Sequence, residues 1–141
     1  MRKTLIVLTA LAGQVFAGGF YLQLGNPEAS AEARKLGAVV TVKATGCHDP
    51  GLAKLSANAI GVVDGKRSTV PLEVKGLGEP GFFAVVGQWP KEGKWVVELT
   101  ATNGEQFTNT LIPVGPNGLD RYHDKANLKK FTPQEVDAML R

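Results

Sequence analysis

Residues 81–114 read GFFAVVGQWPKEGKWVVELTATNGEQFTNTLIPV, and this stretch predicts three consecutive β-strands. The first strand is an apolar run, the second opens at Trp95, and the third returns after Asn103-Gly104. Apolar residues recur at every second position from Trp95 onward, which is typical of a strand with one buried face. Asn-Gly favours a type I′ turn, whose twist matches that of a two-stranded hairpin. The stretch therefore predicts a hairpin with Trp95 in the core, and it sets the register of the other strands.

Further strands are predicted on the N-terminal side of this stretch, over residues 38–45, 55–63 and 67–74. Asp64-Gly65 lies between the last two of these strands and predicts another type I′ turn. Pro71 cannot donate a ladder hydrogen bond, so its side of the strand is expected at a sheet edge. Polar residues that alternate with apolar ones are expected on the wet face of half-exposed strands. These are Asn58, Ser68, Thr100, Thr108 and Thr110.

The predicted strands follow one another without a helix long enough to connect parallel neighbours, which excludes a parallel sheet. Their number and spacing are typical of β-sandwiches. We therefore expect an all-β fold, an antiparallel immunoglobulin-like sandwich whose core covers residues 38–114. The chain of 141 residues is one domain by its length.

Residues 18–37 precede the sandwich core and contain two signals. An edge strand is expected over residues 18–25. Asn26-Pro27-Glu28 then looks like a helix start, because Asn is a good N-cap and Pro suits the first helical turn. Gly37 would end such a helix. A short helix and a solvated loop are both compatible with this segment.

Residues 115–141 are expected to form a linker and a short C-terminal helix. Thr132 and Glu135 have the spacing of a capping box, and Phe131 and Val136 have that of a hydrophobic staple. Val136 and Leu140 lie on one apolar face of this helix. Because so short a helix is marginal alone in water, it should dock either on its own sandwich or on a partner. Docking on its own domain is the simpler expectation.

Residues 1–17 have the pattern of a signal peptide. Arg2 and Lys3 precede an apolar run at residues 5–12, and small residues occupy the positions before a cut after Ala17. The run is too short to span a bilayer as a helix. We expect export to a periplasm or beyond the cell, and no membrane-spanning segment after cleavage.

Cleavage at this point changes the charge of the chain. Of the 16 Lys and Arg residues, Arg2 and Lys3 are removed, which leaves 14 cations against 13 Asp and Glu. No basic stripe remains, so nucleic acid is not an expected partner. The chain has a single cysteine, so no internal disulfide is possible and packing must hold the fold.

Cys47 and His48 are the candidate metal ligands. Asp49 follows them directly, and His123 could join them if the tail folds back. Thiolate and imidazole together suit copper or zinc. Alternatively, Cys47 is a small buried residue and His48 a solvated turn residue, since a structural zinc site needs about four ligands. A third reading is an intermolecular disulfide through Cys47.

A partner surface is a second candidate, and catalysis is not expected. Trp89 lies in a turn, and together with Phe131, Val136 and Leu140 it could face another protein. The simpler expectation for Trp89 is a packing role that covers one end of the sandwich. The sequence has no Gly-x-Ser-x-Gly, His-Glu-x-x-His or phosphate-binding glycine loop. We expect a non-enzymatic protein without a cofactor.

One pattern of glycine, aromatic and aliphatic positions runs through Gly81, Phe83, Ala84, Gly93, Trp95, Val97 and Leu99. With this pattern, the sequence between residues 38 and 114 resembles small exported immunoglobulin-like domains of the YtkA-like and FixH-like kind. The resemblance implies an accessory or metal-delivery role, as in copper handling or respiratory-oxidase assembly. The expected function is thus an exported binding or accessory module whose partner is another exported or membrane-associated protein. The alternatives are a periplasmic metal carrier using Cys47 and His48, and an enzyme of unknown chemistry.

Overall fold

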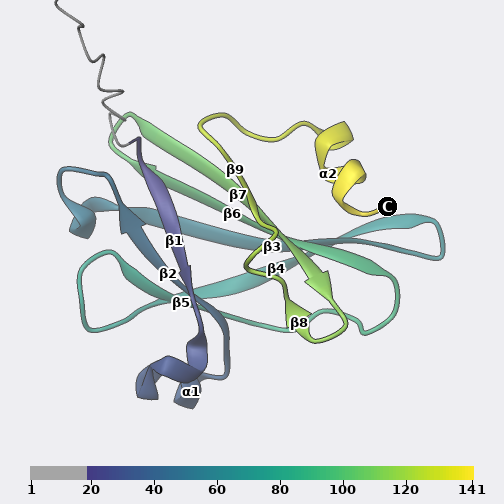
Figure 1. Cartoon of the computed structure of the whole chain (residues 1–141), viewed down its shortest axis with the longest axis horizontal. Coiled ribbons are helices and arrows are strands. Elements are labelled where there is room, and N and C mark those ends of the chain that lie inside the picture. The colour runs from purple at the N-terminus through teal and green to yellow at the C-terminus, as the bar shows by residue number, and fades with distance from the viewer. Residues whose placement is uncertain (1–18) are drawn as a thin grey trace, which may run out of the picture.

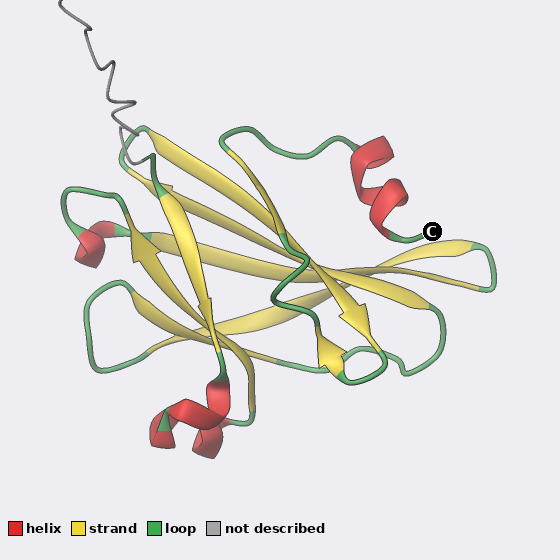
Figure 2. Cartoon of the chain, viewed as in Figure 1, coloured by secondary structure: helices red, strands yellow, loops and turns green. Residues whose placement is uncertain are grey.

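The computed structural model describes residues 19–141, and the predicted signal peptide, residues 1–17, lies outside the described residues. The described chain is mostly antiparallel β-structure with short helical elements (Figures 1 and 2). The strands are β1 (Tyr21–Gly25), β2 (Ala38–Thr45), β3 (Lys54–Val63), β4 (Lys66–Gly76), β5 (Phe82–Val86), β6 (Lys94–Asn103), β7 (Gln106–Gly115), β8 (Gly118–Leu119) and β9 (Lys125–Asn127). The helices are α1 (Ala31–Leu36) and α2 (Pro133–Met139), with two 3-10 turns, η1 (Pro27–Ala29) and η2 (Pro50–Leu52).

The strands form a curled antiparallel sheet in the order β1-β2-β5-β4-β3-β6-β7-β8, with β9 paired to β7. The curl occurs at β4, which pairs with β3 over residues 66–72 and with β5 over residues 73–76. We call β1, β2, β5 and the end of β4 layer A, and the start of β4 with β3, β6, β7 and β9 layer B. The two layers enclose the core, so the predicted all-β antiparallel fold with a short C-terminal helix is confirmed.

The change of partner in β4 occurs next to a proline. Pro71 pairs with Asn58 of β3, and β5 joins the other edge of β4 only from Glu73 onward. At Pro71 the other edge of β4 therefore has no strand neighbour among the described residues, which agrees with the sheet edge that its sequence predicted.

One of the two predicted type I′ turns is confirmed and the other is wrong. Asp64 and Gly65 have φ of 51° and 75°, as a type I′ turn requires. Asn103 instead pairs with Gln106, so Gly104 and Glu105 are the central residues of the second turn. Gly104 has φ of 59°, but Asp64 is the one non-glycine residue with positive φ between residues 19 and 141. A glycine in the first central position alone is the pattern of a type II′ turn.

The segment before β2 combines both readings that its sequence allowed. The side chain of Asn26 accepts from the backbone N–H of Glu28 and caps η1, not a longer helix. Ser30 is the N-cap of α1, and Gly37, with φ of 68°, ends it. The helix is therefore one turn and a half long, and it covers one end of layer A (Figure 1).

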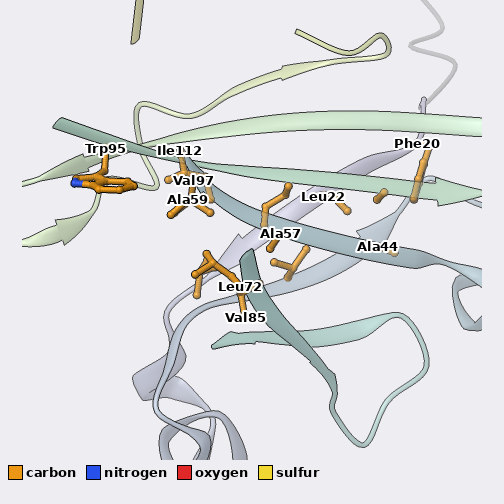
Figure 3. Close-up of a cluster of buried hydrophobic side chains, with 14 residues drawn as sticks. Phe20, Leu22, Ala44, Ala57, Ala59, Leu72, Val85, Trp95, Val97 and Ile112 are labelled. Atoms are coloured by element: carbon orange, nitrogen blue, oxygen red, sulfur yellow. The ribbon is translucent and has the colours of Figure 1, made fainter. Parts of the chain in front are cut away.

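The core between the layers includes Trp95, Val97 and Leu99 of β6, which are at most 4 % exposed, as their alternation predicted. Figure 3 shows Trp95 beside Ala59, Val97 and Ile112. The indole N–H donates to the carbonyl of Glu92 at 2.8 Å. Its ring lies against Gly61, the cross-strand neighbour of Trp95, where a Cβ atom would be 2.3 Å from Cδ2 of the indole. Any larger residue at this position would displace the ring.

Thr108 and Thr110 are each 1 % exposed, so the prediction that they lie on a wet face is wrong. They pair with Ala101 and Leu99, which face the core, and paired residues share a face of the sheet. The hydroxyl of Thr110 has no hydrogen-bond partner among the described residues. Two threonines thus lie on the core-facing side of β7. Because they are polar, the sequence predicted the opposite face for them.

The outer face of layer B is covered by the tail. Val136 and Leu140 of α2 pack in a cluster with Val96 and Leu111 of the sheet. The capping box predicted at the start of α2 is confirmed. The tail also contributes β8 and β9, which the sequence did not reveal because each has only two or three residues.

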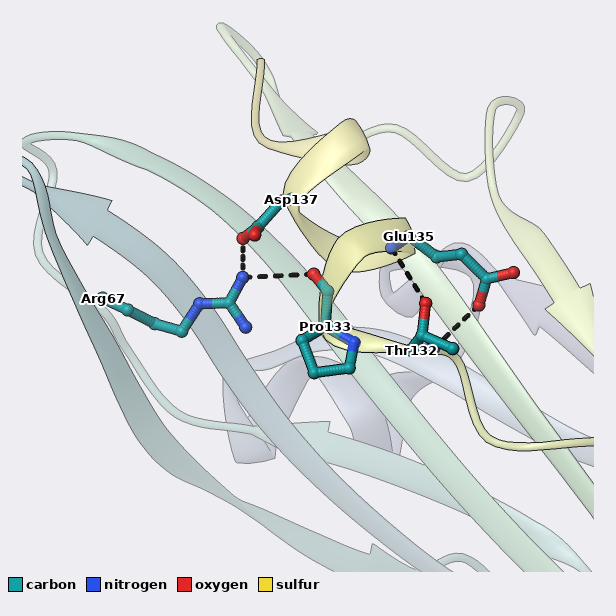
Figure 4. Close-up of polar contacts among 5 residues, drawn as sticks. All are labelled: Arg67, Thr132, Pro133, Glu135 and Asp137. Carbon is teal, nitrogen blue, oxygen red and sulfur yellow. Dashed lines mark hydrogen bonds and ion pairs between the residues drawn. The ribbon is translucent and has the colours of Figure 1, made fainter.

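Polar contacts hold the tail in place. Asn109 is fully buried; its amide donates to the carbonyl of Leu99 at 3.0 Å and its Oδ1 accepts from the backbone N–H of Phe131 at 2.9 Å. Arg67 of β4 forms an ion pair with Asp137 and donates to the carbonyl of Pro133 at 3.4 Å (Figure 4). The helix therefore docks on its own domain, which was the simpler of the two expectations.

We predict that Gly61→Ala destabilises the fold by about 1–3 kcal/mol, because the added methyl overlaps the Trp95 ring and overpacking costs this much. The matched control is Gly76→Ala, at a strand position where a Cβ meets nothing within 4 Å. Urea denaturation measures both variants. Equal stabilities of the two variants would show that the ring does not constrain Gly61.

We predict that Leu140→Ala destabilises the fold by about 2 kcal/mol or more, because it removes a side chain that is 7 % exposed. Deletion of residues 131–141 should cost more, since it also exposes Val96 and Leu111. The matched control is Ala138→Gln on the exposed side of α2, which should be nearly neutral. An unchanged unfolding midpoint after the deletion would mean that α2 is not part of the folding unit.

Candidate functional site

The predicted metal ligands Cys47, His48 and Asp49 lie in the loop between β2 and β3. Cys47 is partly buried and packs against the core, whereas His48 and Asp49 are exposed. Asp49 stabilises the loop through two hydrogen bonds. Its Oδ1 accepts from the backbone N–H of Gly51 at 3.0 Å, and its carbonyl accepts from Asn103 Nδ2 at 2.7 Å. The loop is therefore held by Asp49 to η2 and to the β6–β7 turn.

His123, the fourth predicted ligand, is exposed and lies in a turn of the tail, with its Nδ1 2.6 Å from Asp120 Oδ2. Desolvation by burial acts to raise the pKa of Asp120, but hydrogen bonds from His123 and from the Tyr122 backbone, with the attraction of His123, outweigh it and lower the pKa. From residue 19 to the C-terminus, no three His, Cys, Asp or Glu residues are grouped so as to hold a metal ion. Cys47, His48 and Asp49 are together only as sequence neighbours.

The four residues of the predicted partner surface have different environments. Val136 and Leu140 are 4 % and 7 % exposed beneath their own helix, so they offer no free surface in this arrangement. Phe131 is half-buried beside the same cluster. Trp89 is half-buried against the main core. The structure thus joins Phe131, Val136 and Leu140 in one cluster and leaves Trp89 separate.

A groove of about 510 Å³ lies on the outer face of layer A. Its floor is formed by β1 and β2, where Gln23 pairs with Lys43 and Gly25 with Thr41. A Cβ atom at Gly25 would be 2.4 Å from Thr41 Oγ1, so glycine here leaves space above the threonine. One end of the groove is closed by η1 and the start of α1, and the β4–β5 loop borders it with Glu79.

The lining of this groove offers several unengaged polar groups. Within the described residues, no side-chain hydrogen bond or ion pair engages Gln23, Lys43 or Glu79. Phe82 contributes an aromatic surface, and Thr41 is 4 % exposed at the floor. The volume is within the range of ligand-binding clefts. The groove therefore offers hydrogen-bond acceptors, a cation, an anion and an apolar surface. Together these groups can bind a ligand.

The sequence did not indicate these groove residues as a binding site. The alternation of β2 placed Thr41 and Lys43 on one face, which was a usable signal. The sequence predicted the edge strand that becomes β1, but it left open the structure of the segment that forms the end wall, η1. The groove forms over the outer face because β1 pairs with β2, and this pairing is not encoded in the local sequence.

Comparisons with protein-family models, with curated proteins and with solved structures found no match to this chain. The resemblance to YtkA-like and FixH-like domains stays a prediction from seven residues of the strand pattern. No helix of the described residues is long and apolar enough to cross a membrane.

We predict that the chain binds Zn(II) and Cu(I) weakly, and that Cys47→Ala/His48→Ala binds them equally weakly, since adjacent residues supply at most two of about four ligands. Calorimetric titration of the two proteins under reducing conditions measures this. Thiol labelling of Cys47 should be slower in the folded protein than in urea. Tight binding that the double variant loses would establish a metal site at this loop.

Proposed function

We propose that this chain is a non-enzymatic exported binding module whose partner is another exported or membrane-associated protein, held by the groove over layer A. The observation that carries this proposal is the groove itself, with free polar side chains above a rigid strand floor. Export rests on the signal-peptide pattern of residues 1–17.

A protein partner is favoured over a small molecule by the surroundings of the groove. Tyr21 is 47 % exposed, and its pairing with Thr45 places it on the same face as Gln23. Tyrosine is enriched at protein interfaces because it offers a large, rigid contact area. In the described sheet, β1 pairs with β2 alone, so its outer edge can accept an extended segment of a partner.

The described residues of the groove favour binding over catalysis. Its lining includes Lys43 and Glu79 but no histidine or cysteine, and Ser30 already accepts from the backbone N–H of Ala33 at 3.2 Å as the cap of α1. A nucleophile needs an adjacent base to be activated. The groove side chains therefore suit recognition of polar groups.

We predict that Gln23→Ala/Lys43→Ala weakens capture of the partner from the exported fraction about tenfold, since central interface residues carry most of the binding free energy. The matched control is Lys54→Ala/Ser56→Ala, two exposed positions on β3 in layer B. Quantitative mass spectrometry of captured proteins and a photo-crosslinker at Gln23 or at Ser56 give the readout. Crosslinks from Ser56 but not from Gln23 would place the interface on the other layer and contradict the proposal.

A further inference from the structure

A second groove, of about 320 Å³, lies on the outer face of layer B, where the tail crosses the sheet. Strands β3, β4 and β6 form its floor, and the segment before α2 forms its wall together with the first turn of α2. The groove contains an acidic side chain, Glu98, which alternates along β6 with the core-facing Val97 and Leu99. The tail passes beside this face and buries it.

Glu98 is 7 % exposed, and its carboxylate has no hydrogen bond or ion pair with any described residue. Within the described residues its oxygens are not among the buried side-chain atoms that lack a partner, so they open onto the groove. A ligand that enters the groove can therefore reach the carboxylate. Glu98 is thus an acceptor at the floor of a groove with its binding capacity unused.

The basic residues around the groove do not neutralise Glu98. The guanidinium of Arg67 is engaged by Asp137 and by the carbonyl of Pro133 (Figure 4). Lys130 lines the groove but is exposed, and no ion pair joins it to Glu98. The negative charge is therefore available to a cation from outside the chain.

The other groove residues define what kind of cation fits. Asn58 is the cross-strand neighbour of Glu98, and Thr69 lies on the next strand, so three oxygen acceptors line the same groove. An ammonium group has three N–H donors and no acceptor. Ile60 and Phe131 add apolar surface that suits a methylene chain.

We propose that this groove binds an alkyl ammonium group, with the ammonium on Glu98 and its methylene chain against Ile60 and Phe131. The group is a lysine side chain of a protein or a free aliphatic amine. Both present the same ammonium and methylene chain to the groove. The site is separate from the groove over layer A and does not depend on the protein-binding proposal.

The test is a titration of the protein with four probes, monitored by NMR chemical shifts and by calorimetry. N-acetyl-lysine methylamide represents a peptide lysine, and pentylamine represents a free amine. N-acetyl-norleucine methylamide and pentanol are their uncharged counterparts. We expect saturable binding of at least one amine with shifts at Phe131 and Ile60, and at least tenfold weaker binding of its uncharged counterpart. The stronger of the two amines identifies the source.

Two variants complete the test. Glu98→Gln should weaken amine binding at least tenfold while the protein stays folded, because it keeps the shape of the side chain and removes the charge that attracts the ammonium. Lys130→Gln should bind the amine at least as tightly as the unmodified chain, since it removes a competing cation. Equal binding by Glu98→Gln, or equal binding of charged and uncharged probes, would overturn the proposal. Amine binding by Lys130→Gln but not by the unmodified protein would show that Glu98 already holds the Lys130 ammonium. This outcome would also overturn the proposal.

Discussion

The packing of Trp95 over Gly61 is the contact on which the sandwich depends. The two residues are cross-strand neighbours in the β3–β6 pair, and the indole occupies the space that a Cβ atom would need. The indole N–H is satisfied by the carbonyl of Glu92, so the ring is buried without an unpaired donor. An aromatic ring above a strand glycine fixes register, because a slip of one strand by one residue would turn its side chains to the opposite face and separate the ring from the glycine. The chain has one cysteine, and this contact provides part of the constraint that a disulfide provides in other small domains.

Strand β4 then determines how the sheet becomes two layers. Its first seven residues extend layer B and its last four extend layer A, with the change beside Pro71. A proline cannot donate to a neighbour on its outer edge, so β5 can only join after it. The same strand therefore closes one side of the core without a connecting loop. Arg67, near the start of β4, also anchors α2, so the bent strand is linked to the tail.

The sequence predicted the elements whose signals are local. Strand β2 has the bounds that its alternation indicated, the capping box of α2 forms as its spacing required, and Asp64-Gly65 makes its turn. The failures have physical causes that lie outside the local sequence. Thr108 and Thr110 face the core because β7 must pair with β6 in a register set by other residues. Strands β8 and β9 exist only through pairing with β7, and the groove over layer A arises from the contact of two distant segments.

The tail changes the chemistry of the face that it covers. Without it, Glu98 would be a solvated residue on the outer face of layer B, and its position in the alternation would need no further explanation. Asn109 brings the backbone of Phe131 down to the sheet, and this buries one side of the groove that contains Glu98. A carboxylate that would face open solvent on a bare strand is thereby placed at the floor of a groove. The docking that stabilises α2 and the groove around this acceptor are two consequences of one contact, so a ligand that binds the acceptor would also favour the docked tail.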